Sequence, residues 1–128
     1  MTITGIQPNT SIKKFLSGII HLGYNIKVIN PNSNTNVGTG TKIQFFRNNQ
    51  LEAQFTAIIY GDITGNGLID KNDLNLLNQY LLKVEPLNKH QLTAADVNHD
   101  GRVNNKDLLL LNKYLANDYS ISQDKKGA

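Results

Sequence analysis

The chain has 128 residues, a formal net charge of +3 and no cysteine. This length holds one ordinary domain or two very small ones, and the lack of cysteine excludes a disulfide framework and any cysteine-based metal site or nucleophile. No segment approaches the roughly 20 apolar residues that a membrane helix needs, and the N-terminus lacks the pattern of a signal peptide. We therefore expect any export signal to lie outside this sequence.

The basic balance is the sum of two unlike halves. Residues 1–60 carry five cations against the single acid Glu52, whereas residues 61–117 carry six cations against seven acids. Six of the ten acids fall in two windows of twelve residues, 62–73 and 96–107. The few scattered cations of the first half are a weak signal for nucleic-acid binding, so we disfavour that function.

Residues 1–60 are predicted to form a small α+β module. Residues 10–20 have the pattern of a helix, with three candidate capping residues, Asn9, Thr10 and Ser11. Three segments with alternating apolar residues then predict strands at 24–29, 42–46 and 52–59. The last segment leads almost directly into Asp62, so no flexible linker separates the two halves and we expect them to pack together.

The second half contains two copies of one unit. Residues 62–81 align without gaps onto residues 96–115, with an offset of 34 throughout. Each copy begins with a loop rich in Asp, Asn and Gly and continues in an amphipathic helix whose leucines recur at i, i+3 and i+7. Asp70 and Asn104 stand one residue before these helices, where an N-cap acceptor belongs. A further short helix is predicted over residues 89–95 of the connection.

Both loops have the spacing of oxygen donors that a calcium site needs. Ca²⁺ binds six to eight oxygen atoms, and a twelve-residue loop supplies them from positions 1, 3, 5, 7, 9 and 12, with glycine at position 6. Gly67 and Gly101 occupy that glycine position, and no histidine occupies a ligand position, which disfavours zinc and copper. The predicted ligands are Asp62, Thr64, Asn66, the Leu68 carbonyl, Asp70 and Asp73 in the first loop, and Asp96, Asn98, Asp100, the Arg102 carbonyl, Asn104 and Asp107 in the second.

The two predicted sites are not equivalent. One such loop alone would be compatible with an ordinary turn, but two copies in register favour a metal-binding function. Thr64 at position 3 and the neutral Asn66 at position 5 lead us to expect weaker calcium binding in the first loop. Because the three carboxylates of each loop repel one another without metal, we also expect the calcium-free half to be loosened or unfolded.

This duplicated loop–helix pattern resembles a dockerin, closest to the type I pattern. The resemblance rests on the Asp, rather than Glu, at position 12 of each loop and on the continuation to Tyr80-Leu81 and Tyr114-Leu115. It covers residues 61–117, with repeats at 62–83 and 96–117 and the connecting helix at 89–95. It implies an all-α module that holds two Ca²⁺ ions in two F-hand loop–helix repeats.

The resemblance also implies a function for the chain. Dockerins bind cohesin modules in a calcium-dependent way, which attaches a parent enzyme or surface protein to a scaffoldin in a cellulosome or a similar extracellular assembly. Residues 1–60 resemble the short leader modules that precede dockerins in clostridial-type extracellular proteins, and residues 118–128 are predicted to be a polar tail. The chain is thus expected to be a non-catalytic fragment of a larger secreted or cell-surface protein, and a monomer when free.

The outward sides of the two repeat helices are the predicted docking face. On a helical wheel, the residues opposite the leucine stripes are Lys71, Asn75, Asn78, Gln79 and Leu82, and Asn105, Leu109, Asn112, Lys113 and Ala116. The contact positions of the family, carried onto this sequence, are Lys71, Asn72, Asn78, Gln79 and Lys83, and Asn105, Lys106, Asn112, Lys113 and Asn117. The Ser/Thr pair that is common at positions 10 and 11 in cellulolytic members is absent, so partner specificity does not transfer.

The sequence of the predicted docking face leads to two further expectations, one about the preferred helix and one about the charge of the partner. Leu109 stands where the first repeat has Asn75, so we hypothesise that the second helix is the preferred docking surface, although an exposed leucine is often ordinary surface or a contact with a neighbouring module. Two bound Ca²⁺ ions raise the formal charge from +3 to +7. An acidic surface on the partner is therefore expected to face the lysines of the docking face, Lys71, Lys83, Lys106 and Lys113.

Other functions are less well supported. The acids outside the loops and the three histidines show no spacing typical of an acid–base pair, so catalysis is not expected. Carbohydrate binding by residues 1–60 is the better alternative, with the calcium repeats as a structural appendage. However, the chain has no tryptophan, and its strand aromatics, Phe45, Phe46, Phe55 and Tyr60, are more consistent with a core. A third interpretation, which we favour for the leader, is that it only shields apolar surface of the calcium-binding half.

Overall fold

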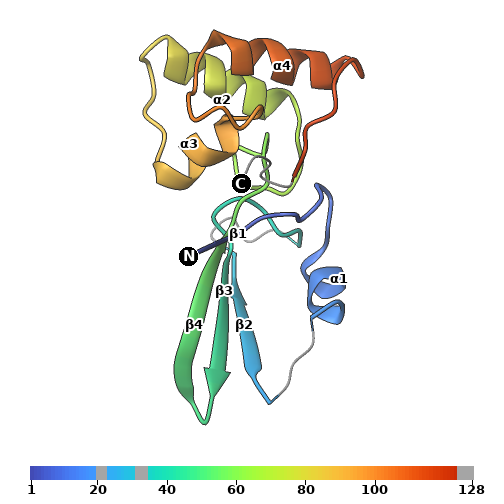
Figure 1. The fold of residues 1–128 in the computed structure, drawn as a ribbon, viewed down its shortest axis with the longest axis vertical. Helices are drawn as coiled ribbons and strands as arrows, with labels where there is room; N and C mark the ends of the chain where they lie inside the picture. Colours follow the sequence, from blue (N-terminus) through green and yellow to red (C-terminus); the bar gives the residue numbers. More distant parts are fainter. Residues whose placement is uncertain (20–22, 31–34, 124–128) are drawn as a thin grey trace.

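The computed structural model describes residues 1–19, 23–30 and 35–123, and it is mixed helix and strand, as the α+β prediction requires (Figure 1). A sheet and one short helix form one end of the molecule, and three helices form the other. Within the described ranges, no helix is both long and apolar enough to span a bilayer. The elements in chain order are β1 (Thr2–Ile3), α1 (Ile12–Ser17), β2 (Asn25–Ile29), β3 (Lys42–Arg47), β4 (Gln50–Ala57), α2 (Lys71–Leu81), α3 (Lys89–Ala95) and α4 (Asn105–Leu115).

The sheet has four strands in the order β1-β4-β3-β2, one strand more than the sequence predicts. Strands β2, β3 and β4 are antiparallel neighbours, whereas β1 pairs in parallel with β4. The prediction of three strands was wrong because β1 is too short to show any alternation, and only its pairing with β4 makes it a strand. Asn48 and Asn49 both have positive φ, at 51° and 64°, and form the tight turn between β3 and β4. This turn lets β4 begin at Gln50, two residues before the predicted segment.

Helix α1 is shorter than the predicted helix over residues 10–20. Of the three candidate caps, Ser11 is the one used, since its side chain accepts a hydrogen bond from the Lys14 N–H. The helix ends before Gly18, and residue 20 lies outside the described residues. Helix α1 packs Ile12 and Phe15 against one face of the sheet, over a core formed by Ile6, Val37, Ile43, Ala57 and Ile59.

The aromatic side chains of the leader module (residues 1–60) pack against one another. The ring of Phe45 makes edge-to-face contacts with Tyr24 and Phe55, with centroids 5.8 and 5.9 Å apart. The guanidinium carbon of Arg47 lies 4.2 Å from the centroid of the Tyr24 ring. These contacts give Phe45 and Phe55 a packing role, as the sequence interpretation favours.

Helices α2 and α4 pack side by side over a shared core. Their leucine stripes meet, with Leu77 and Leu111 fully buried among Ile63, Leu87 and Ala95. Helix α3 has the predicted bounds and is capped by Asn88. The predicted N-caps of α2 and α4 are also confirmed: Asp70 and Asn104 each take part in a capping box with the aspartate three residues later.

The chain after α4 returns to the joint between the sheet and the helices (Figure 1). The Gln123 side-chain amide pairs with the Tyr60 backbone, accepting from its N–H at 2.8 Å and donating to its carbonyl at 3.0 Å. The Gln123 carbonyl accepts a hydrogen bond from the Gly5 N–H, and Ile121 packs on Ile58 and Tyr60. Part of the predicted polar tail is therefore packed structure, and residues 124–128 lie outside the described residues.

Candidate calcium loops and docking face

Loop one (residues 62–73) and loop two (residues 96–107) share one pattern of hydrogen bonds at their first carboxylate. The Asp62 carboxylate accepts the N–H groups of Asn66 and Gly67 at 3.2 and 2.9 Å. Asp96 accepts the corresponding N–H groups of Asp100 and Gly101 at the same distances. Gly67 and Gly101 have φ values of +83° and +85°, a conformation that side-chain-bearing residues rarely adopt.

The equivalence extends to the middle and the end of each loop. At position 5, the side-chain oxygens of Asn66 and Asp100 accept the N–H groups of Leu68 and Arg102. At position 12, Asp73 and Asp107 accept the N–H groups of the N-cap residues of α2 and α4, at 2.9 and 3.0 Å. Each loop therefore ends on a carboxylate that is already fixed in the first turn of its helix.

Loop two brings three carboxylates together. Side-chain oxygens of Asp96, Asp100 and Asp107 lie within 4.8 Å of one another, the one such cluster of three among the residues that the structure describes. Burial raises the pKa of Asp107, and the charges of Asp96 and Asp100 raise it further. Hard oxygen donors that converge and repel one another fit a Ca²⁺ ion, which binds carboxylates and supplies the missing positive charge.

Loop one is more deeply buried and has a different charge arrangement. The Asp62 and Asp73 side chains are both 0% exposed. Burial raises the pKa of Asp73 to about 7, and the charge of Asp62 adds to the effect. Within the described residues, Asp70 does not join these two in a cluster of three, and its carboxylate instead accepts the Asn72 N–H as the N-cap. Two buried carboxylates with the Thr64 hydroxyl beside Asp73 also fit a divalent cation, with fewer charged donors than in loop two.

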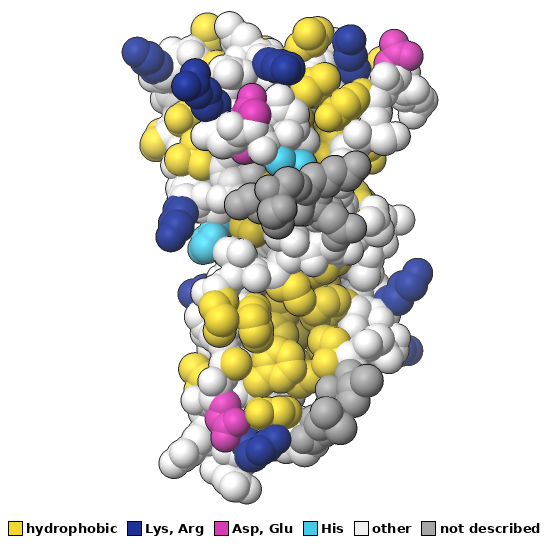
Figure 2. Space-filling view, viewed as in Figure 1, with side chains coloured by type: hydrophobic (Ala, Val, Ile, Leu, Met, Phe, Trp, Pro, Cys, Tyr) yellow, Lys and Arg dark blue, Asp and Glu magenta, His cyan; other side chains and the backbone are white. Residues whose placement is uncertain are grey.

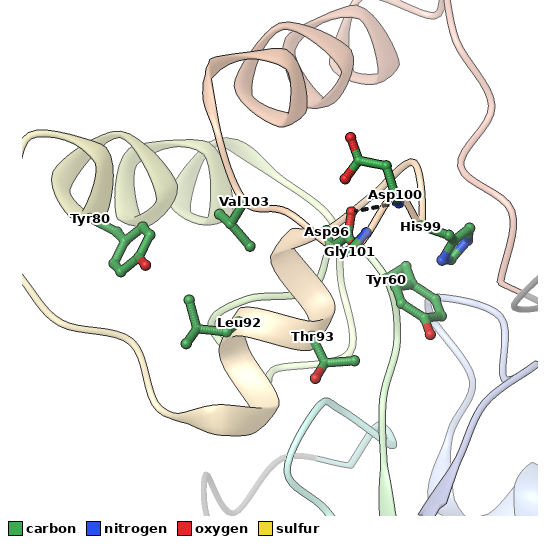
Figure 3. A pocket seen from close by; sticks show the side chains of 9 residues that line it. All are labelled: Tyr60, Tyr80, Leu92, Thr93, Asp96, His99, Asp100, Gly101 and Val103. Atoms are coloured by element: carbon green, nitrogen blue, oxygen red, sulfur yellow. Dashed lines mark hydrogen bonds between the residues drawn. The ribbon is translucent and has the colours of Figure 1, made fainter.

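His99 has a structural role that the sequence interpretation missed. His99 lies in a polar loop, yet its ring lies edge-on to Tyr60 with centroids 4.1 Å apart. One ring nitrogen, Nε2, is 2.9 Å from the Ser122 carbonyl oxygen. Figure 3 shows His99 and Tyr60 beside Asp96 and Asp100, around a hollow next to loop two. The contact joins segments distant in sequence, so no local signal reveals it.

Every residue predicted for the docking face is exposed. This holds for both sets, Lys71, Asn72, Asn75, Asn78, Gln79, Leu82 and Lys83 around α2, and Asn105, Lys106, Leu109, Asn112, Lys113, Ala116 and Asn117 around α4. Lys83 and Asn117 have φ values of 61° and 64° and stand at the same place after their helices, so the two helix ends are alike as well.

A shallow groove runs between the two repeat helices. It is lined from α2 by Leu74, Asn75 and Asn78, and from α4 by Asn105, Leu108, Leu109 and Asn112. Leu109 is 53% exposed and lies at this groove. The groove lining does not include the lysines of the docking face. The structure therefore presents an amide-lined groove with one exposed leucine between two equivalent helices.

Comparison with known proteins assigns residues 60–116 to a protein family. Residues 60–116 match the family described as the dockerin type I domain. These residues are a type I dockerin module. The match confirms the resemblance inferred from the repeats, and it spans both loops and helices α2 to α4. A dockerin is a non-catalytic module.

A solved structure is also similar to this part of the chain. The dockerin is similar to a chain in a solved structure, that of the third cohesin of ScaC in complex with the ScaB dockerin, mutated in its C-terminal helix, from Acetivibrio cellulolyticus. The identity is 28%, the TM-score is 0.48, and the match covers 54% of this chain and 97% of that chain. No curated protein matches the chain.

Proposed function

We propose that the dockerin binds a cohesin module in a calcium-dependent way and so attaches its parent protein to a scaffoldin. Membership of the dockerin family supports the class of partner. The observation that carries the proposal is the correspondence of the two loop–helix units, with matching hydrogen bonds at positions 1, 5 and 12 of both loops and with exposed residues at every predicted contact position.

Two Ca²⁺ ions are proposed as the cofactors, held by the twelve residues predicted from the loop spacing. A bound ion would supply the positive charge that the clustered carboxylates require. The Asp73 and Asp107 carboxylates link each loop to the first turn of α2 or α4, because each is both a proposed ligand and the partner of the N-cap backbone. A bound calcium ion would therefore be linked through one carboxylate to the first turn of each helix.

The proposed docking face consists of the exposed sides of α2 and α4. Figure 2 shows Lys and Arg side chains over both ends of the molecule, with acidic side chains among them at the helical end. The proposed partner surface is acidic because Lys71, Lys83, Lys106 and Lys113 are all exposed on the proposed docking face. We infer that α4 is the preferred surface, because Leu109 supplies an exposed apolar side chain where α2 has Asn75. Buried apolar anchors surrounded by polar contacts are typical of interfaces with concentrated binding energy.

The same proposal implies where the parent protein acts and what kind of protein it is. A dockerin that serves a cellulosome or a similar assembly works outside the cell, so we propose a secreted or cell-surface protein that acts in polysaccharide breakdown. The leader module is proposed to support the dockerin. Carbohydrate binding by the leader stays an untested alternative, and the packing of Phe45 and Phe55 does not favour it.

Calorimetric titration of the whole chain with a panel of cohesins tests the proposal. Binding to at least one cohesin in calcium, and its loss in excess chelator, is the expected result. A glycan array with the same protein is the control for the alternative. Binding to a glycan without binding to any cohesin would overturn the proposal.

A further inference from the structure

The leader module touches loop one through the backbone. A Cβ atom placed on Gly38 would lie 2.0 Å from the Gly65 carbonyl oxygen and 2.8 Å from the Gly67 nitrogen. A Cβ atom on Gly67 would in turn lie 2.6 Å from the Val37 carbonyl oxygen. Residues 36–39 and the turn of loop one are therefore in direct contact, with glycines on both sides of the contact.

Hydrogen bonds hold the same contact. The Thr39 N–H donates to Oδ2 of Asp62 at 3.0 Å, and Asp62 is the first proposed calcium ligand of loop one. The Asn9 N–H donates to the Gly67 carbonyl at 2.7 Å. Thr39 is itself held, because its hydroxyl exchanges hydrogen bonds with the carbonyl and the N–H of Ile59, both at 3.1 Å. The leader thus orients a proposed ligand from a rigid, buried segment.

Among the residues that the structure describes, none gives loop two comparable support at the equivalent positions. Asp96 accepts hydrogen bonds from Asp100 and Gly101, which belong to its own loop. A Cβ atom on Gly101 would meet nothing within 4 Å, and both Asp100 and Gly101 are exposed. Loop two contacts the rest of the chain through His99, Val97 and Val103, whose side chains are not proposed ligands. The two loops share the hydrogen bonds of their first carboxylate but differ in what surrounds that carboxylate.

We propose that residues 36–39 of the leader are an outer shell of the first calcium site, which holds loop one in its binding conformation with or without the ion. This inference rests on the proposed binding of calcium. Outer-shell groups that orient a ligand strengthen metal binding, and a site that is already ordered loses less conformational freedom when the ion binds. The first site is then the tighter one, contrary to the order expected from its ligand types.

The arrangement also separates the two docking helices. Loop one continues into α2 and loop two into α4. With loop one held by the leader, α2 keeps its position without calcium, whereas α4 depends on the ion in loop two. Loop two and α4 are therefore the calcium-responsive part of the dockerin, and the loosening expected without calcium is confined to them.

Gly38→Ala in the whole chain tests the outer shell. Gly38 does not have a positive φ, so alanine conflicts with the contact to Gly65 and not with the local backbone. Gly18→Ala is the matched control, since a Cβ atom there makes only an ordinary contact, at 3.6 Å from Phe15 O. Calcium titration should show two unequal sites in the wild type. The tighter site should weaken by about 10–100-fold in Gly38→Ala and stay unchanged in Gly18→Ala.

Hydrogen–deuterium exchange in excess chelator shows which of the two loops the Gly38→Ala substitution loosens. The Gly65 and Gly67 amides of the wild type should exchange more slowly than the Gly101 amide, and Gly38→Ala should remove this difference. If Gly38→Ala fails to fold, Thr39→Ala provides the same reading, because it removes the hydroxyl that fixes the segment and keeps the N–H.

Three results would overturn the inference or its basis. Equal exchange of both loops in the wild type would show that the leader does not hold loop one. Equal weakening of both calcium sites in the variant would show a general loss of stability instead of an outer-shell role. A wild type that binds no calcium would refute the proposed function. Slow exchange of the loop one amides in that protein would still show that the leader supports loop one.

Discussion

Replacement of Gln123 by alanine should destabilise the joint between the leader and the dockerin. The Gln123 side chain is 4% exposed, and its amide satisfies both the N–H and the carbonyl of Tyr60, 63 residues away. Alanine removes both hydrogen bonds and leaves two buried backbone groups without these partners. An unsatisfied buried group costs about 1–3 kcal/mol, so with two such groups we expect the free energy of unfolding to fall by about 2–6 kcal/mol.

Urea unfolding of the whole chain in calcium, followed by circular dichroism, measures this loss. Ser120→Ala is the matched control, because Ser120 is exposed in the same segment and its change should stay within about 0.5 kcal/mol. Gln123→Glu should not restore stability, since a carboxylate accepts from the Tyr60 N–H but cannot donate to its carbonyl. A loss below about 0.5 kcal/mol in Gln123→Ala would refute the structural role of this amide.

Four further results are expected. Burial raises the pKa of Asp73 to about 7, against 3.8 for the free side chain. In excess chelator, the free energy of unfolding in urea should therefore be highest below pH 4 and should fall as the pH rises to 7. A free energy of unfolding that rises over this range would contradict the burial of Asp73. Leu109→Asp should weaken cohesin binding in calorimetry more than Asn78→Asp, and the reverse order would refute the preference for α4. Leu111→Ala should cost about 2–5 kcal/mol in urea unfolding, because the side chain is fully buried; a loss below about 1 kcal/mol would contradict its core role. Association with cohesin should slow as salt rises in stopped-flow measurements, and a salt-independent rate would exclude electrostatic steering.

The structure confirms those parts of the sequence interpretation that depend on local spacing. Asp70 and Asn104 cap α2 and α4 because an N-cap bond joins residues only two or three apart. Leu77 and Leu111 are buried because helical periodicity places them on one side. The exposure of the residues predicted for the docking face follows from the same periodicity. Such features are readable in the chain because each depends on neighbours within one or two helical turns.

The same reasoning could not find contacts between distant segments. Strand β1 has two residues and no alternation, and it forms only because the edge of β4 offers free backbone groups. His99 lies in a polar loop, yet the arrival of Tyr60 and Ser122 makes it a packed residue. Gln123 belongs to a segment that reads as a polar tail. In each case the partner is brought close by the fold, and no spacing within the segment indicates it.

The sequence by itself determined the two loop–helix units, the proposed ligands and the outward faces of α2 and α4, because their repeat has a strict offset of 34 and every feature lies within one unit. Only the tertiary structure decided that the leader contacts loop one and, among the described residues, not the equivalent residues of loop two. The backbone N–H of Thr39 reaches the Asp62 carboxylate across 23 residues, and the Gly38 backbone meets the Gly65 backbone across 27. A backbone group that makes a contact leaves almost no trace in side-chain patterns, so the contact between the leader and loop one appears only in the folded chain.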